Sequence, residues 1–197
     1  NPRLYSHAEA CTDVRHRGSY EHAIGWARHV AETTTPQDRH MSIGAFRPSD
    51  TEGMGPRETT PCAIPWFVFE AEKGDLFDRY HATRCMLECL EAAGCDMAKV
   101  VVSYSGNKSF HVRIPAGMFG RPVFTSVRSA QRVVSRFASE FFEETLDAAL
   151  FDPRHLIRMI GSRHEEGGYV TGFRASAFQR LSLEEVLTAS QKPHPFR

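Results

Sequence analysis

The chain has 197 residues, of which 41% are hydrophobic and 24% are charged. This composition is ordinary for one globular domain with a sizeable core, and it excludes the disordered, collagen-like and disulfide-scaffold classes. No apolar run approaches the roughly 20 residues that a membrane-spanning helix needs. The five cysteines show no paired spacing, which favours a reducing compartment of cytoplasmic type.

The charge is balanced overall but not along the chain. The 24 Lys and Arg residues cancel the 24 Asp and Glu residues, and a net charge of zero argues at first against a nucleic-acid partner. Residues 1–100, however, hold 11 basic and 15 acidic residues, whereas residues 101–197 hold 13 and 9. Arginine supplies 20 of the basic residues, which suits phosphate binding, although a genome-wide preference for Arg explains it more simply. The total charge therefore decides nothing.

The hydrophobic pattern alternates between helical and strand periods. Helices are predicted over residues 20–33, 77–93 and 126–146, with a last helix opened by a capping box at Ser182 and Glu185. Strands are predicted over residues 41–46, 65–69, 100–102, 110–114, 156–160 and 169–173, and an exposed loop over residues 47–62. The interleaving favours an α+β fold with a mostly antiparallel or mixed sheet.

Two acidic residues follow the strand predicted at residues 65–69. Glu70 and Glu72 are spaced i and i+2, so in a continued strand both carboxylates project from one face. A divalent cation removes their mutual repulsion, since Mg²⁺ and Mn²⁺ prefer oxygen ligands. The alternative is a solvent-facing polar edge with Lys73 as the partner.

A polar turn lies between the strands predicted at residues 100–102 and 110–114. It contains Ser105, Lys108 and Ser109, and His111 follows on the same strand face as Ser109. Turn amides, hydroxyls and a lysine can form a nest for phosphate. The alternative for His111 is a hydrogen-bonded core histidine. The glycine spacing is not that of a P-loop, and no helix follows directly.

The third segment of interest places acids ahead of arginines. Asp147 and Asp152 precede Arg154, Arg158 and Arg163. A carboxylate for metal ions followed by arginines for a triphosphate is the arrangement that nucleotide chemistry needs. The alternative is that Asp152 caps a turn and that the arginines are surface groups.

Taken in order, these three segments resemble the archaeo-eukaryotic primase superfamily over about residues 66–174. Residues 147–164, followed by 181–185, are similar to the primase domains of phage and plasmid replication proteins and of primase-polymerases. The resemblance implies an RNA-recognition-motif-like mixed or antiparallel sheet with flanking helices. It also implies one catalytic domain over residues 1–197, with a core at about 63–180, an N-terminal subregion at about 1–62 and a C-terminal helix at about 181–197. We expect this domain to be a piece of a longer protein.

The resemblance also implies a site for two-metal nucleotidyl transfer. The implied ligands of two Mg²⁺ or Mn²⁺ ions are Glu70, Glu72 and Asp147, with Asp152 as a competitor for the third position. His111 is an implied catalytic residue that also contacts the incoming triphosphate. The other implied contacts to nucleotide or template are Ser105, Lys108, Ser109, Arg158, Ser162, Arg163 and His164.

The expected activity is that of a DNA primase or primase-polymerase on a single-stranded DNA template. The expected substrates are rNTP or dNTP. The expected partner is a helicase or C-terminal region of the full-length protein. We expect a phage- or plasmid-encoded protein in the cytoplasm of a bacterial host, without a membrane partner. The family usually has Asp where this chain has Glu70, so a weakened or inactive nucleotide- or DNA-binding replication module is the first alternative. A metal-dependent nuclease is the second. The zero net charge then predicts weak, salt-sensitive template binding.

Zinc is not expected. His81, Cys85 and Cys89 are spaced i, i+4 and i+8 on a predicted helix, and we expect the two cysteines to point into or along the core as small hydrophobic side chains. The chain has no Cys-x-x-Cys pair of the kind that structural zinc sites use.

Overall fold

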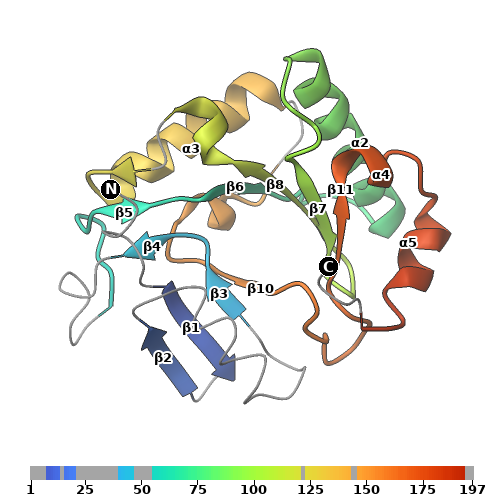
Figure 1. Ribbon diagram of the computed structural model, residues 1–197, viewed down its shortest axis with the longest axis horizontal. Coiled ribbons are helices and arrows are strands. Elements are labelled where there is room, and N and C mark those ends of the chain that lie inside the picture. Colours follow the sequence, from blue (N-terminus) through green and yellow to red (C-terminus); the bar gives the residue numbers. More distant parts are fainter. Residues whose placement is uncertain are drawn as a thin grey trace.

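The computed structural model contains two antiparallel sheets that face each other, with helices on the outer side of one of them (Figure 1). The structure describes the backbone of residues 8–13, 16–20, 40–46, 55–120, 123–142 and 146–193, with side chains from residue 40 onward. The helix predicted over residues 20–33 and residues 47–54 of the loop predicted over residues 47–62 lie outside the described residues.

The central sheet has the strand order β11-β7-β8-β6, and every pairing in it is antiparallel. Its strands are β6 (Trp66–Phe69), β7 (Val101–Tyr104), β8 (Phe110–Pro115) and β11 (Thr171–Arg174). The β7–β8 hairpin encloses the polar turn, which confirms the antiparallel arrangement expected from the sequence.

The second sheet has the order β10-β3-β1-β2 and lies on the other side of the central sheet from α2 and α3 (Figure 1). Its strands are β1 (Ala8–Asp13), β2 (His16–Tyr20), β3 (His40–Ser42) and β10 (Leu156–Arg158). The neighbouring strands β10 and β11 therefore belong to different sheets. A small third sheet contains β4 (Ala45–Phe46), β5 (Cys62–Ala63) and β9 (Val123–Phe124), so Cys62 is a buried strand residue rather than part of an exposed loop.

Side-chain caps fix where the three longest helices begin. The helices are α2 (Leu76–Ala92), α3 (Val127–Phe141), α4 (Ala175–Phe178) and α5 (Leu183–Ala189), with 3₁₀ turns η3 (Ala116–Phe119) and η4 (Ala148–Phe151). Ser182 and Glu185 form the predicted capping box of α5, and Asp75 caps α2 in the same way. The helix predicted to reach residue 146 ends at Phe141, because Phe142 adopts an extended conformation and packs its ring 5.1 Å from that of Phe69.

Phenylalanine rings fill the space between the central sheet and α3. The Phe69 ring is fully buried and lies 5.6 Å from that of Phe137 on α3, and the Phe67 ring lies 5.5 Å from the same side chain. Buried aromatic contacts of this kind contribute both apolar area and specific ring geometry. The main core therefore lies on the helix side of the sheet.

The cysteines of α2 do not join that core. Cys85 and Cys89 are exposed, so the expectation that they point inward is wrong. Helical residues advance by about 100° each, which places Cys85 about 200° from both Thr83 and Leu87 on the buried stripe. None of the helices in the described ranges is long and apolar enough to cross a membrane.

Candidate functional site

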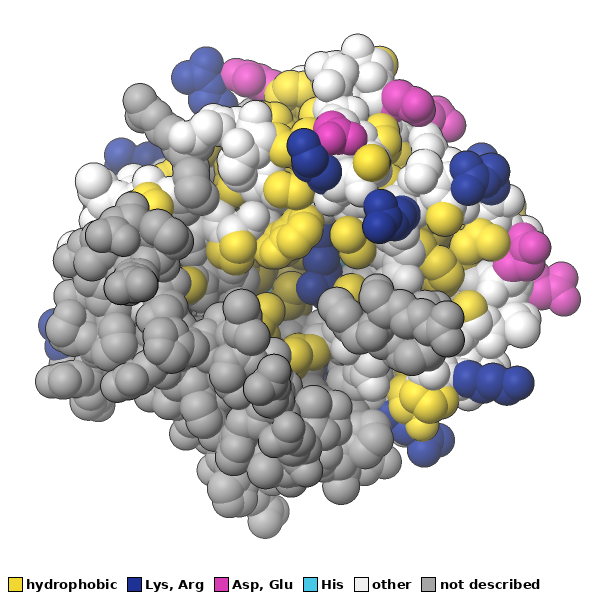
Figure 2. Space-filling model, viewed as in Figure 1, with side chains coloured by type: hydrophobic (Ala, Val, Ile, Leu, Met, Phe, Trp, Pro, Cys, Tyr) yellow, Lys and Arg dark blue, Asp and Glu magenta, His cyan; other side chains and the backbone are white. Residues whose placement is uncertain are grey.

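A cavity of about 200 Å³ lies between the central sheet and the second sheet. On the face shown in Figure 2, some Lys and Arg side chains lie beside the central hollow and others lie at the edges. The residues that line the cavity come from the β7–β8 hairpin, the end of β6, η4, β3, β10 and the loop before β11. They are His40, Glu70, Ser105, Lys108, Ser109, His111, Asp147, Leu150, His155, Leu156, Ile157, Arg158 and His164.

Backbone pairing brings two acids from distant parts of the chain to this cavity. An isolated β-bridge joins Ala71 to Leu146, and the Asp147 amide donates to the Glu70 carbonyl oxygen at 3.0 Å. Asp147 then caps η4, accepting from the Ala149 amide at 2.9 Å. The two carboxylates thus reach one cavity although neither lies within a regular strand.

Glu70 has partners on both carboxylate oxygens. Its Oε2 lies 2.9 Å from His111 Nε2, and its Oε1 lies 3.4 Å from Arg79 Nη1. The pairing of Phe69 with Val112 continues by one residue and sets Glu70 opposite His111. His111 is 7% exposed, and its Nδ1 is buried without a hydrogen-bond partner in the described part of the chain. Glu70 is therefore held firmly at the cavity wall.

Arg79 is a site residue that the sequence analysis missed. From the first turns of α2 it donates to the Glu72 carbonyl oxygen at 2.7 Å and to the Gly74 carbonyl oxygen at 3.2 Å, in addition to its contact with Glu70. These bonds fix the backbone that follows β6. The Glu72 side chain is exposed and does not line the cavity. No sequence pattern marks Arg79, because its role depends on where α2 packs.

The polar turn is closed by its own hydrogen bonds. Ser105 donates its amide to the Ser109 carbonyl oxygen at 2.8 Å, and its Oγ accepts from the Ser109 amide at 3.0 Å. The Ser105 hydroxyl is therefore used within the turn, while Lys108 and Ser109 border the cavity. The turn presents a hydroxyl and an ammonium group from a well-defined backbone.

Glycines allow a second loop to support this turn. Gly106 has a φ of +84° and accepts from the Gly168 amide at 2.6 Å. A Cβ on Gly106 would lie 2.4 Å from the Gly168 carbonyl oxygen, so any side chain there would clash with backbone. The close approach explains the glycines in both segments.

Arg113 is a second residue that the sequence analysis did not select. It lies two residues beyond His111 on the same face of β8, and its Nη2 donates to the Arg158 carbonyl oxygen at 3.3 Å. Its Nε is buried without a hydrogen-bond partner in the described ranges. Burial lowers the pKa of Arg113 to about 10. The side chain thus connects β8 to β10 and leaves a desolvated positive charge beside the cavity.

Two of the residues that the sequence suggested for nucleotide binding lie away from the cavity. Ser162 is buried and donates to the Met159 carbonyl oxygen at 2.6 Å. Arg163 is exposed, with its guanidinium 5.9 Å from the centre of the Tyr169 ring. Neither lines the cavity.

Asp152, the competitor for the third acid, is paired with Arg154. Its Oδ2 accepts from Arg154 Nη2 at 2.6 Å, and its Oδ1 accepts from Arg154 Nε at 2.9 Å. Burial by itself raises the pKa of Asp152, but the hydrogen bonds and charge of Arg154 outweigh burial and lower it below its ordinary value. Asp147, not Asp152, lines the cavity.

The donor set of the cavity suits a hard cation only in part. Glu70 and Asp147 supply carboxylate oxygens, the ligands that Mg²⁺ and Mn²⁺ prefer. Within the described residues, no three His, Cys, Asp or Glu side chains form a group that could hold a metal ion. Two carboxylates are therefore in place, and Glu72 is not grouped with them.

Comparison with known proteins identifies the fold. No family model matches the chain, and no curated protein matches it by sequence. The polymerase domain of Mycobacterium tuberculosis ligase D, in complex with DNA, superposes with a TM-score of 0.55 at 18% identity, covering 95% of this chain and 71% of that one. The AEP domain of the cyanophage S-2L primase-polymerase gives a TM-score of 0.49 at 16% identity, covering 96% and 90%. The chain shares its fold with the ligase D polymerase domain, and its antiparallel sheets with flanking helices are those of the predicted α+β fold.

Proposed function

We propose that this chain is a nucleotidyltransferase that synthesises primers on a single-stranded DNA template from rNTP or dNTP, as a DNA primase or primase-polymerase. The observation that carries the proposal is that one cavity collects the Glu70 and Asp147 carboxylates with Lys108, Ser109 and Arg158. A cavity that holds carboxylates together with phosphate-binding groups is what transfer of a nucleotidyl group requires. The similar fold of a polymerase domain solved with DNA supports it.

The residues of the hairpin are proposed to bind the triphosphate. Ser109 and Lys108 border the cavity from the turn, and Arg158 borders it from β10. A guanidinium can hold two phosphate oxygens at once, whereas an ammonium acts as a compact charge. Together they would hold the incoming nucleotide with its α-phosphate toward the acids.

The acids are proposed to hold Mg²⁺ or Mn²⁺. When bound, divalent ions supply a Lewis acid that activates the attacking 3′-hydroxyl and stabilises the departing pyrophosphate. Glu70 and Asp147 are the proposed ligands inside the cavity. The carboxylate of Glu72, two residues after Glu70, is the proposed third ligand. His111 orients the Glu70 carboxylate through Nε2.

The proposal is tested by primer synthesis on single-stranded DNA with Mg²⁺ and, separately, with Mn²⁺. We expect Glu70→Gln to reduce the rate at least about 100-fold, since it removes a charge that the reaction requires. Glu88→Gln, an exposed α2 residue, is the matched control and should leave the rate unchanged. Equal product from wild type and Glu70→Gln contradicts the assignment. Glu72→Gln should reduce the rate of primer synthesis if three carboxylates hold the metal ions, and leave it unchanged if only two do.

A second candidate is a nucleotide-binding module without catalysis. It is favoured by the contacts of Glu70, whose two oxygens already have His111 and Arg79 as partners. Nucleotide binding by the wild type, measured by calorimetry with Mn²⁺ present, together with no primer under any condition, would support this candidate. Cleavage of the template without added nucleotide would instead indicate a nuclease.

A further inference from the structure

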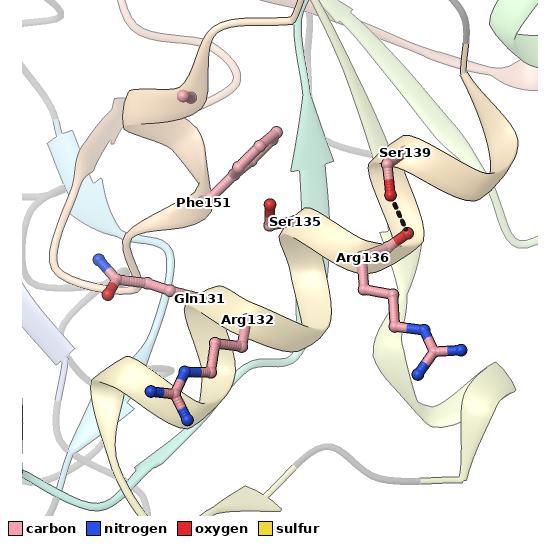
Figure 3. Close-up of a pocket in the computed structure, with 7 residues that line it drawn as sticks. Gln131, Arg132, Ser135, Arg136, Ser139 and Phe151 are labelled. Atoms are coloured by element: carbon pink, nitrogen blue, oxygen red, sulfur yellow. Dashed lines mark hydrogen bonds between the residues drawn. The ribbon is translucent and has the colours of Figure 1, made fainter.

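A second concavity, of about 500 Å³, lies between α3 and η4 (Figure 3). We call it the α3–η4 groove. Figure 3 shows Arg132 and Arg136 extending from α3 and the Phe151 ring directed toward the helix near Ser135. The residues that line the groove are Gln131, Arg132, Ser135, Arg136, Ser139, Ala148 and Phe151.

The groove and the cavity lie on two sides of the same 3₁₀ turn. A 3₁₀ helix has three residues per turn, so side chains at i and i+3 lie one above the other. Asp147 and Leu150 form one such pair and line the cavity, whereas Ala148 and Phe151 form the next pair and line the groove. A strand of nucleic acid that passes Asp147 can therefore cross η4 and enter the groove directly.

The helix side of the groove carries positive charge in a regular row. Arg128, Arg132 and Arg136 are spaced i, i+4 and i+8, so they share one face of α3, with a rise of about 6 Å between neighbours. That rise is of the same order as the separation of successive phosphates on a single strand. All three side chains are exposed.

The ion pairs of this row leave it able to bind another anion. Arg128 pairs with Glu58, and Arg136 pairs with Glu140 at 2.9 Å, but both pairs are exposed. Exposed pairs of this kind contribute little stability, so a phosphate can take the place of the carboxylate. No ion pair joins Arg132 to an acid among the residues the structure describes.

The remaining lining suits the other parts of a nucleic-acid strand. The Ser139 hydroxyl donates to the Arg136 carbonyl oxygen at 2.9 Å, and the Ser135 hydroxyl faces the same groove (Figure 3). Phe151 is anchored by an edge contact to Phe69, with ring centres 6.0 Å apart, and remains partly exposed. Its ring offers an apolar surface for a sugar or base, in the way that single-strand-binding proteins combine aromatic rings with cations.

We infer that the α3–η4 groove binds the phosphate backbone of the single-stranded DNA template as it leaves the cavity. The inference rests on the proposed function, since the template is the substrate proposed there. It adds a binding surface on the far side of η4, with Arg132 and Arg136 as phosphate contacts and Phe151 as the apolar wall.

The inference is tested by the binding of a fluorescein-labelled single-stranded 20-mer, followed by anisotropy at several salt concentrations. We expect the double variant Arg132→Ala/Arg136→Ala to weaken binding about tenfold at low salt. The plot of the logarithm of the association constant against log salt has a negative slope. Its magnitude should be smaller by about 1 to 1.5 in the variant, because two phosphate contacts to a single strand are lost.

The matched control is Arg174→Ala/Arg180→Ala, which removes two exposed arginines away from the groove. It should leave both the affinity and the salt slope unchanged. Equal losses in the two double variants would overturn the inference, because they would reflect overall charge rather than this groove. An unchanged affinity in the groove variant would overturn it as well. Thermal unfolding of both variants should match the wild type, since all four side chains are exposed.

The outcome is separable from that of the proposed function because binding is measured without catalysis. If the protein makes no primer, the proposed activity is wrong. Reduced DNA binding by the groove variant would still support the α3–η4 groove as a DNA-binding surface. If primer synthesis is present, the groove variant should raise the KM for template about tenfold and leave kcat and the KM for nucleotide within about twofold. A fall in kcat at saturating template would overturn the assignment as a template contact.

Discussion

The two faces of the central sheet have opposite chemistry although the same strands build them. On β8, Phe110, Val112 and Ile114 alternate with His111 and Arg113. The first three are buried, and the Phe110 ring lies 6.0 Å from the Tyr80 ring of α2. His111 and Arg113 point to the cavity side, where they contact Glu70 and the backbone of β10.

This difference separates what stabilises the fold from what could perform chemistry. Residues that alternate along a strand are adjacent in sequence but belong to different environments. The helix face buries apolar rings with few polar atoms, whereas the cavity face carries a buried guanidinium nitrogen and a buried imidazole nitrogen without hydrogen-bond partners in the described part of the chain. Such groups lower stability, and sites that bind ligands tolerate them.

The largest expected effect comes from breaking the helix face. Phe69→Ala removes a fully buried ring that contacts the rings of Phe137, Phe142 and Phe151, and it should lower the free energy of unfolding by about 3–5 kcal/mol. Urea unfolding followed by circular dichroism measures this loss. Ser109→Ala, on the cavity side, should change stability by less than about 1 kcal/mol and act on primer synthesis instead. A stability loss from Ser109→Ala as large as that from Phe69→Ala would abolish the proposed separation.

Replacing Arg113, the buried charge on the cavity face, is expected to raise the free energy of unfolding rather than lower it. Arg113→Met replaces a desolvated guanidinium, whose pKa is lowered to about 10, with an apolar side chain of similar length. It should stabilise the protein by about 1–3 kcal/mol in urea unfolding at pH 7, since a largely buried charge without an ion pair among the described residues is costly. The same variant should raise the KM for nucleotide, because Arg158 loses the bond that holds its backbone.

Val112, the neighbour of Arg113 on the helix-facing side of β8, provides the matched control. Val112→Ala removes two buried carbon atoms and should destabilise the protein by about 2 kcal/mol without changing the KM for nucleotide. Destabilisation of comparable size in Arg113→Met would show that this arginine is a structural residue.

The smallest change in stability is expected for Asp152, whose carboxylate is already paired with Arg154. Asp152→Asn should lower the free energy of unfolding at pH 7 by about 0.5–1 kcal/mol, because its pair with Arg154 is partly solvated. The folded-state pKa of Asp152 lies below the ordinary value of 3.8, so this stability is present above that value and is lost as the pH falls further through the folded-state pKa. Urea unfolding between pH 7 and pH 3 should show the two proteins converging at the acidic end. A difference that persists at acidic pH would mean that Asp152 acts through something other than its charge.

Local patterns predicted the elements of the central sheet well. The alternation in β8, the hairpin at the polar turn and the capping box at Ser182 all depend on neighbouring residues, which the sequence displays directly. The assignment of β10 and β11 to two sheets is not visible in this way, because both strands are short and neither has a local pattern that specifies its partner strand. The end of α3 at Phe141 depends on a ring contact with Phe69, which only packing reveals.

For the candidate site, local patterns were enough to identify the chemical types: acids after β6 and before η4, a Ser-x-His strand, and the basic Arg158 on β10. The sequence carried this much because motif spacing and strand alternation are local properties. Which of these groups share a cavity depends on the tertiary structure. The tertiary structure sets Glu70 and Asp147 together, leaves Glu72 exposed, and places Arg79 against the Glu70 carboxylate. Those outcomes depend on how sheets and helices pack across long sequence separations, and no local pattern encodes such distances.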